Sequence, residues 1–300
     1  MTATTDRPAT VPTFQGVSAA RRFKNALATI LIVLAFVVAL IPLALVLITV
    51  IGKGYHALLS MDWWTHSLRG VLPEDFAGGA YQAIYGTLVQ GLVCALIAVP
   101  LGVLAGIYLV EYGRGRIAKT TTFMVDILSG VPSIVAALFI FAVWIATLGF
   151  QQSALAVSLA LVLLMLPIVV RSTEEMLRLV PDELREASYA LGVPKWKTIL
   201  RIVVPTAFSG IVTGLMLALA RVMGETAPVL VLVGYSRSIN YDIVNGNMAS
   251  LPLMIYNELL NPTPAGEQRL WGAALTLIIV IMFFSLLATI VSRLSAIKTK

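Results

Sequence analysis

Charged residues are scarce in this sequence of 300 residues. Lys, Arg, Asp and Glu together make up 12% of it, whereas soluble domains carry roughly 25%. The hydrophobic share is 59%, and the mean hydropathy is +0.92. A compact soluble fold could not bury so much apolar surface. The composition therefore excludes a water-soluble globular protein and predicts an integral membrane protein.

Cysteine is almost absent, and so are the motifs of several classes of enzyme. The single Cys94 excludes an intrachain disulfide. The sequence has no G-x-x-x-x-G-K-[ST] phosphate loop, so the chain cannot hydrolyse ATP by that route. It also has no nucleophile and base at a recognisable catalytic spacing. We therefore expect no catalytic residues, no cofactor and no enzymatic activity in the chain itself.

Two other kinds of ligand are disfavoured. The net charge of +6 reflects membrane topology better than it reflects nucleic-acid binding. His56, Asp62 and His66 could be imagined as metal ligands. They stand beside Trp63 and Trp64, however, where an aromatic anchor at the membrane surface is the favoured interpretation. We predict neither a nucleic-acid partner nor a metal site.

Six apolar segments are long enough to cross a membrane, which takes about 20 residues. They are 26–51, 82–110, 120–148, 153–171, 205–234 and 270–293. Several exceed the minimal length, which implies a tilt or a break. The first is too long for the apolar part of a cleaved signal peptide, so we interpret it as a spanning helix. The predicted fold class is all-α, a polytopic membrane protein with six transmembrane helices.

Lys and Arg are distributed unevenly between the two sides of these spans. Most of the 21 fall in the N-terminal tail, the loops 112–119 and 171–201, and the C-terminus. Cytoplasmic segments carry an excess of Lys and Arg, so both termini are predicted to be cytoplasmic. The predicted outer loops, 52–81 and 235–269, contain few. We expect residues 1–25 to form a disordered cytoplasmic tail. Residues 26–300 would form the transmembrane domain, with a core over 82–293.

Small residues recur at helical spacing within two of the spans. Gly102 and Gly106 form one pair, and Gly210 and Gly214 form another. Such pairs let helix backbones approach closely inside a membrane. They predict two places where helices pack against each other.

The cytoplasmic loop 172–204 contains the most specific stretch, "VPDELREASYALGVPKWKTILRIVVP" at 180–205. Pro181 suits a helix start, Gly192 a left-handed exit and Pro194 a second start. The pattern predicts two short helices joined at Gly192. Periodicity alone leaves open whether they dock on a partner or rest on lipid.

The spacing within this stretch resembles the "EAA…G…I-x-L-P" loop of ABC importer permeases. Ser188 replaces the usual second Ala, and Val204 replaces the usual Leu. The resemblance implies that residues 181–192 form a coupling helix that docks on a separate ATPase. The coupling residues that it implies are Glu186, Ala187, Ser188, Gly192 and Pro205.

Ionisable residues inside predicted spans are costly and therefore candidates for function. Asp126 lies near the start of the third span, where we expect it to reach water or Lys119. Arg221 lies roughly 24 Å along the helix from Pro205. That depth is too great for its side chain to reach the inner surface easily.

Glu225 follows Arg221 at the i+4 position, so the two can pair. Pro228 cannot donate to the carbonyl of Gly224, which weakens the helix beside the pair. One interpretation is a structural pair that ties this helix to a neighbour. The other is an anion pathway, in which Arg221 attracts the solute and Glu225 orients the guanidinium. A carboxylate would also accept the hydroxyl of hydrogen phosphate, which sulfate lacks.

The stretch "ARVMGETAP" resembles the permeases of bacterial phosphate importers. Similar stretches are "PLGVLAGIYLVEY" at 100–112, "GVPSIVAALFIF" at 130–141 and "SLPLMIYNELL" at 250–260. The resemblance implies a MetI-like permease of the bacterial inner membrane, in contact with lipid. Its partners would be a homologous PstC-like permease, two PstB-like ATPase subunits and an extracytoplasmic PstS-like phosphate-binding protein. The implied pathway residues are Arg221, Gly224, Glu225, Thr226 and Pro228.

Three other functions remain open from sequence. The chain could serve an importer of another oxyanion, such as sulfate, molybdate or phosphonate. It could be a self-sufficient secondary transporter that uses Arg221 and Glu225 as a proton-linked pair, although the spacing of the coupling loop argues against this. It could also be a membrane scaffold that transports nothing.

Overall fold

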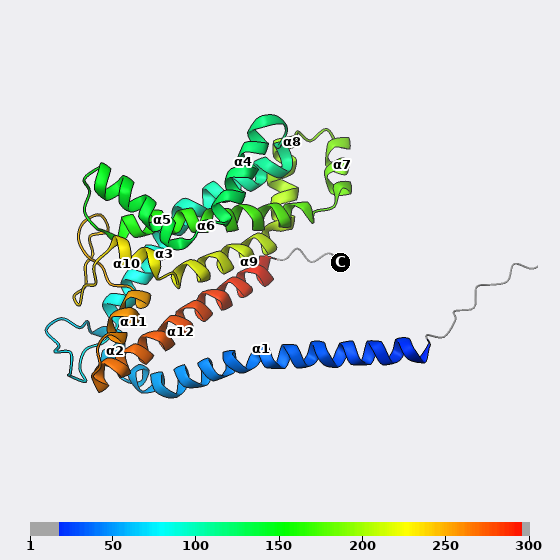
Figure 1. Ribbon diagram of the computed structural model, residues 1–300. Coiled ribbons are helices and arrows are strands. Elements are labelled where there is room, and N and C mark those ends of the chain that lie inside the picture. Colours follow the sequence, from blue (N-terminus) through cyan, green and yellow to red (C-terminus); the bar gives the residue numbers. More distant parts are fainter. Residues whose placement is uncertain (1–17, 296–300) are drawn as a thin grey trace, which may run out of the picture. The chain divides into compact units, whose positions relative to one another are not determined.

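A computed structural model describes residues 18–295, and every regular element in that range is a helix (Figure 1). Five of these helices are long and apolar enough to cross a membrane. A sixth span results if the bent pair α4–α5 counts as one. The predicted all-α membrane fold is confirmed.

The helices are α1 (Ala19–Leu59), α2 (Met61–Thr65), α3 (Tyr81–Ile107), α4 (Gly115–Ser129), α5 (Ser133–Ile140), α6 (Ala154–Arg178), α7 (Asp182–Ala190), α8 (Lys195–Thr198), α9 (Val204–Met223), α10 (Ala227–Leu232), α11 (Leu251–Leu259) and α12 (Pro264–Ser295). The π-helical turns are η1 (Tyr108–Tyr112), η2 (Phe141–Thr147) and η3 (Ile199–Val203). These turns continue α3, α5 and α8 directly.

The chain divides into two compact units, one that ends at Thr49 and one that begins at Val50. In the first unit, α1 begins at Ala19, before the apolar run that predicted it. Ala, Arg and Lys are good helix formers, so the helix extends into the polar flank. Residues 1–17 of the predicted tail lie outside the described residues.

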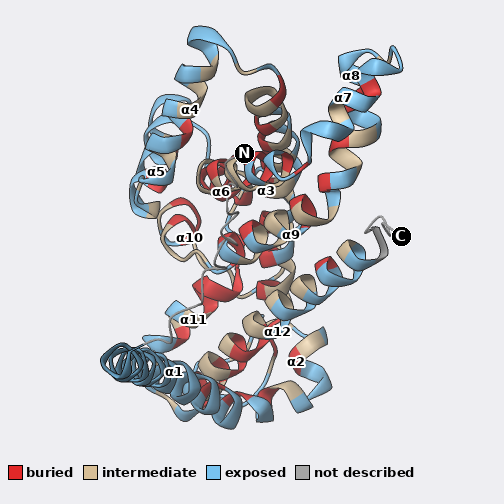
Figure 2. Cartoon of the chain, turned by 90° about the vertical axis from the view of Figure 1, so that its right-hand side faces the viewer, coloured by how far each residue is buried: buried red, intermediate tan, exposed pale blue. Residues whose placement is uncertain are grey.

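Helix α6 forms the centre of the second unit and packs against α3 and α9. Its apolar window is 61% buried, compared with 28% for α3. Figure 2 shows buried positions along α6 and along the faces of α3 and α9. The centre is therefore built from three helices that are distant in sequence.

All four predicted interface glycines face side chains of α6. The facing pairs are Gly102 with Val169, Gly106 with Thr173, Gly210 with Met176 and Gly214 with Ser172. A Cβ atom at any of the four would overlap its partner. The predicted packing role of both glycine pairs is confirmed, because their missing side chains let α3 and α9 approach α6.

The third predicted span is not one straight helix. Helices α4 and α5 meet at an angle of 108°. Pro132 causes the break: it lacks an N–H donor and disfavours helical geometry at Val131. It then forms the N-cap of α5, where its carbonyl accepts the N–H of Val135 at 2.9 Å.

Trp63 was predicted to anchor at the membrane surface, and that prediction is wrong. Its side chain is buried against α12, and its indole N–H donates to the Thr276 hydroxyl at 2.9 Å. Gly272 leaves room for the ring. The segment after α1 folds back on α12, which periodicity within one segment cannot reveal.

The packing of α3 on α6 gives a testable prediction. A Cβ atom at Gly102 would lie 2.5 Å from Cγ1 of Val169. We expect Gly102→Ala to lower the free energy of unfolding by about 1–3 kcal/mol, because the core must shift to accept it. Thermal unfolding of the detergent-solubilised protein measures this.

Gly52→Ala is the matched control. It adds the same methyl group within a helix at a position where no atom lies within 4 Å. We expect its Tm to stay the same or to rise slightly. Equal losses in the two variants would contradict the close-packing explanation.

Candidate functional site

The fifth predicted span, 205–234, is broken at the charged motif. Helix α9 ends at Met223, and α10 begins at Ala227. The N–H groups of Gly224 and Glu225 turn back to carbonyls of the last helical turn, each at 3.2 Å. Pro228 then occupies the first turn of α10, where a missing N–H costs little. The break that the length of this segment and Pro228 predicted is therefore confirmed, and it lies at Gly224–Thr226.

Arg221 lies in the last turn of α9 and Glu225 lies just after the end of that helix, and the two form a loose pair. Nε of Arg221 is 4.0 Å from Oε1 of Glu225. The Arg221 side chain is 70% exposed in this chain, whereas that of Glu225 is 20% exposed. Within the described part of the chain, Arg221 pairs with no other acid. The pair therefore ties α9 to no neighbouring helix of this chain.

Glu225 lines a small cavity between the break, α3 and the start of α11. The cavity has a volume of about 10 Å³, which is room for about one water molecule. Its polar lining comes from Thr87 and Gln90 on α3 and from Ser250 before α11. Thr226 and Pro228 stand beside Glu225 but do not line this cavity.

The coupling stretch folds into the predicted pair of short helices, α7 and α8. Gly192 joins them with a φ of +75°, a left-handed geometry that favours glycine. The buried hydroxyls of Ser188 and Thr198 lie 2.8 Å apart and hold the two helices together. Ser188 departs from the usual Ala, and its hydroxyl supplies this extra contact. Leu191 and Trp196 are exposed.

The other sequence-predicted coupling residues lie at different depths. Glu186 and Ala187 are exposed in the middle of α7, and Gly192 follows the end of that helix. Pro205 is half-buried in the first turn of α9. Figure 1 shows α7 and α8 at one end of the second unit and α2 and α11 at the other. The residues predicted for coupling lie between α7 and the first turn of α9, whereas those predicted for the pathway lie between the last turn of α9 and α10.

Comparison with known proteins agrees with this geometry. The family described as "Binding-protein-dependent transport system inner membrane component" matches residues 98–299. The chain belongs to this family.

Several relatives are similar over nearly their whole length. The chain is 66% identical to "Phosphate transport system permease protein PstA" of Mycobacterium leprae (strain TN) over 278 residues, which is 93% of this chain and 91% of that one. It is also 66% identical to PstA 1 of Mycobacterium tuberculosis (strain ATCC 25618 / H37Rv), with 95% and 93% covered. The PstA of Haemophilus influenzae (strain ATCC 51907 / DSM 11121 / KW20 / Rd) is 40% identical, with 87% and 91% covered.

Solved structures confirm the MetI-like permease fold. A chain of the MetNI methionine ABC transporter superposes with a TM-score of 0.56 at 19% identity, and covers 72% of this chain and 94% of its own. A chain of a bacterial alginate ABC transporter gives 0.68 at 14% identity, with 93% and 98% covered. The protein is therefore a multi-pass membrane permease of an ABC importer, which works with ATPase and binding-protein partners.

The sequence analysis did not predict the ion pair that holds α7. Arg185 of α7 donates from Nε to Glu111 Oε1 at 3.2 Å, and the Glu111 side chain is 5% exposed. The same guanidinium donates to the carbonyls of Leu177 and Val180. Glu111 is the penultimate residue of the run "PLGVLAGIYLVEY", and a carboxylate near the end of an apolar span was the available signal.

Asp126 was expected to reach water or Lys119. Its side chain is 58% exposed, but it does not pair with Lys119. It forms an ion pair with Arg171 of α6. Arg171 also donates to Glu174 at 2.7 Å, and Glu174 accepts from Arg178 at 3.2 Å. Asp126 thus ties α4 to α6, away from the break at Gly224.

The opposite end of the permease is held by a second buried ion pair. Arg269 lies 3.2 Å from Glu258, and their side chains are 6% and 2% exposed. Arg269 also donates to the carbonyls of Pro73 and Asp75. This network pins the loop after α2 to α11 and α12.

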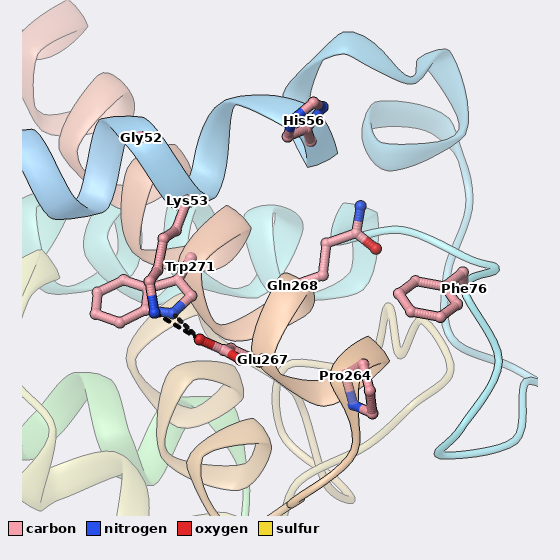
Figure 3. A pocket seen from close by; sticks show the side chains of 8 residues that line it. All are labelled: Gly52, Lys53, His56, Phe76, Pro264, Glu267, Gln268 and Trp271. Carbon is pink, nitrogen blue, oxygen red and sulfur yellow. Dashed lines mark hydrogen bonds and ion pairs between the residues drawn. The ribbon is translucent and has the colours of Figure 1, made fainter.

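A large open cavity lies beside that network (Figure 3). It has a volume of about 510 Å³. Lys53 pairs with Glu267 at 2.7 Å and lies over the Trp271 ring, 5.2 Å from its centre. His56 also lines it, whereas His66 pairs with Asp62 at 3.2 Å.

The loop between α10 and α11 contains a tight polar turn. The carboxylate of Asp242 accepts hydrogen bonds from the N–H of Val244 at 2.9 Å and from both the side chain and the N–H of Asn245 at 3.0 Å. The bonds from Asn245, followed by that from Val244, lower the pKa of Asp242. The turn therefore carries a fixed negative charge at neutral pH.

The ion pair between Glu111 and Arg185 gives a second prediction. Glu111→Gln removes the buried acid that Arg185 faces, so α7 should separate from η1 more often. We expect amide hydrogen exchange over α7 to become about tenfold faster or more. Hydrogen–deuterium exchange mass spectrometry of the purified permease measures this.

Asp182→Asn is the control for the same arginine. Asp182 also pairs with Arg185, at 2.9 Å, but its side chain is 85% exposed. Solvent screens such a pair, so exchange should hardly change. If both variants accelerate exchange equally, burial of the pair is not what holds α7.

Proposed function

We propose that this permease carries inorganic phosphate across the inner membrane of a bacterium as part of an ATP-driven importer. The observation that carries the proposal is 66% identity, over 93% and 95% of the chain, to two phosphate transport system permeases. The proposed partners are a PstC-like second permease, two PstB-like ATPase subunits and a PstS-like phosphate-binding protein. The surrounding membrane lipid contacts the apolar faces of the spans.

The proposed pathway runs past Arg221 and the break that follows it. A guanidinium in a membrane must be neutralised or hydrated, because lipid solvates it poorly. Arg221 is exposed and only loosely paired in the single chain, which suits a side chain that faces the second permease and the anion. Glu225 limits how tightly the anion is held, because the negative charge of its carboxylate repels the anion. Gly224, Thr226 and Pro228 supply the backbone break.

The proposed coupling element is α7 with α8. Leu191 is 83% exposed and Trp196 is 59% exposed, and apolar surface of this kind fits a protein partner. ATP binding in the ATPase subunits would move residues 181–201. The buried pair of Arg185 with Glu111 would pass that motion to α3 and so shift the permeases between outward-open and inward-open forms.

The proposed topology places both termini in the cytoplasm, as the distribution of Lys and Arg predicts. Residues 1–25 are then a cytoplasmic tail, and 26–300 form the transmembrane domain with its core over 82–293. The loops 52–81 and 235–269 face the binding protein. Support comes from their position at the end of the second unit opposite α7 (Figure 1).

Reconstitution of the complete importer in liposomes tests this function. We expect phosphate uptake that requires ATP, the binding protein and the ATPase subunits together. Leu191→Glu should remove the ATPase subunits from the purified complex and abolish uptake, because it puts a charge in the proposed docking surface. Copurification and radiolabelled phosphate flux are the measurements.

Leu72→Glu is the matched control: Leu72 is 57% exposed and lies in the loop after α2, at the end of the second unit opposite α7. It should leave ATPase copurification unchanged. Flux through this chain alone would contradict the proposal and favour a secondary transporter. Stronger uptake of sulfate, molybdate or phosphonate would identify a different oxyanion.

Glu225→Gln tests the pathway in the same liposomes. The amide keeps the shape of the side chain but loses the charge that orients Arg221 and accepts the hydroxyl of hydrogen phosphate. We expect the phosphate uptake rate to fall about tenfold or more, with weaker preference over sulfate. Unchanged uptake and unchanged preference in a properly folded complex would exclude Glu225 from the pathway.

A further inference from the structure

Three buried polar side chains share the small cavity of Glu225, and two of them, Gln90 and Ser250, carry a polar atom that no described residue pairs with. Gln90 is 2% exposed and Ser250 is 1% exposed. Within the described residues, Nε2 of Gln90 and Oγ of Ser250 have no hydrogen-bond partner. Native proteins leave few buried polar atoms unpaired, because each such atom loses its hydration without compensation. Their presence beside Glu225 therefore requires an explanation.

The fold around these side chains does not use their polar atoms. Ser250 is the N-cap residue of α11, a position where serine normally accepts a hydrogen bond from the helix. Its side chain makes no such bond. Pro252 at the second helical position has no N–H to offer it. The N–H of Leu251 donates to the hydroxyl of Thr87 on α3, at 2.8 Å, and so fastens α11 to α3.

The backbone at Gln90 is fixed in a similar way. Its carbonyl shares the hydroxyl hydrogen of Ser158 on α6, at 3.2 Å, with the carbonyl of Ala154, at 2.9 Å. The amide side chain is thus held at the cavity by a well-packed helix, yet its nitrogen stays unpaired. Both groups are preorganised donors, which is how a binding site avoids the cost of ordering side chains when its ligand arrives.

The chemistry of the three groups is complementary to a protonated oxyanion. The Gln90 amide and the Ser250 hydroxyl are donors for anionic oxygens. The Glu225 carboxylate, when ionised, is only an acceptor and suits a P–OH group. Hydrogen phosphate offers both kinds of group, whereas sulfate has no hydroxyl to give.

We propose that Gln90 and Ser250 bind the transported anion together with Glu225. Gln90 and Ser250 donate to its oxygens, and Glu225 accepts from its hydroxyl. This inference rests on the proposed function. The present cavity of about 10 Å³ admits only a water molecule, so the anion enters when the break at Gly224–Thr226 moves away from α3.

The experiment uses the complete importer in liposomes, at saturating phosphate and saturating binding protein. For Gln90→Leu and Ser250→Ala, we expect the phosphate uptake rate to fall about tenfold, since each loses a hydrogen bond to a charged group. The ATP hydrolysis rate should stay within about twofold of that of the unaltered complex, because neither residue lies near α7. The number of phosphate ions carried per ATP then falls.

Gln82→Leu is the matched control. Gln82 lies two turns earlier on α3, is 1% exposed, and its amide is also unpaired, but it does not line the cavity of Glu225. Its removal should leave the ratio of phosphate to ATP unchanged. Ser250→Thr keeps a hydroxyl and should restore the uptake that Ser250→Ala loses.

The outcomes separate this inference from the proposed function. If the unaltered complex carries phosphate and both Gln90→Leu and Ser250→Ala match its ratio of phosphate to ATP, then the inference is wrong and the function stands. Equal losses in Gln82→Leu and Gln90→Leu would show a structural effect and would also overturn the inference. If the unaltered complex carries no phosphate, then the proposed function itself fails.

Discussion

The constraint on which this permease depends is that backbone N–H and C=O groups inside a membrane need partners. A helix can end there only if the chain itself or a polar cavity satisfies the freed groups. At Gly224–Thr226 the N–H groups of Gly224 and Glu225 turn back onto α9, and the Thr226 carbonyl accepts the N–H of Leu230. This break places Glu225 at the cavity that Gln90 and Ser250 also line.

Ion pairs differ along the permease according to what each must do. Glu111 with Arg185 and Glu258 with Arg269 are buried and have further hydrogen bonds, so they hold segments in place. Arg221 and Glu225 are 4.0 Å apart, and the arginine is mostly exposed. A loosely held pair can exchange partners at little cost. This contrast suits a permease in which the segments held by the two buried pairs stay in place while the break between α9 and α10 moves.

Features set by neighbouring residues could be predicted from the sequence. The apolar runs predicted the membrane class, and proline and glycine at fixed spacing predicted α7 and α8. The small residues Gly102 and Gly106 predicted close packing, although not the helix that they face. The burial of Trp63 and the pairing of Asp126 with Arg171 were not predicted. Each joins segments that lie far apart in the sequence.

The sequence by itself determined that the chain crosses a membrane, that two short helices meet at Gly192 and that two opposite charges stand beside a weak point in a helix. These follow from hydropathy and helical spacing, which act over a few turns. Only the tertiary structure decided that the helix ends at Met223 and that Gln90 and Ser250 meet Glu225. Those residues come from three segments, and they meet because α3 packs on α6 and α11 packs on α3.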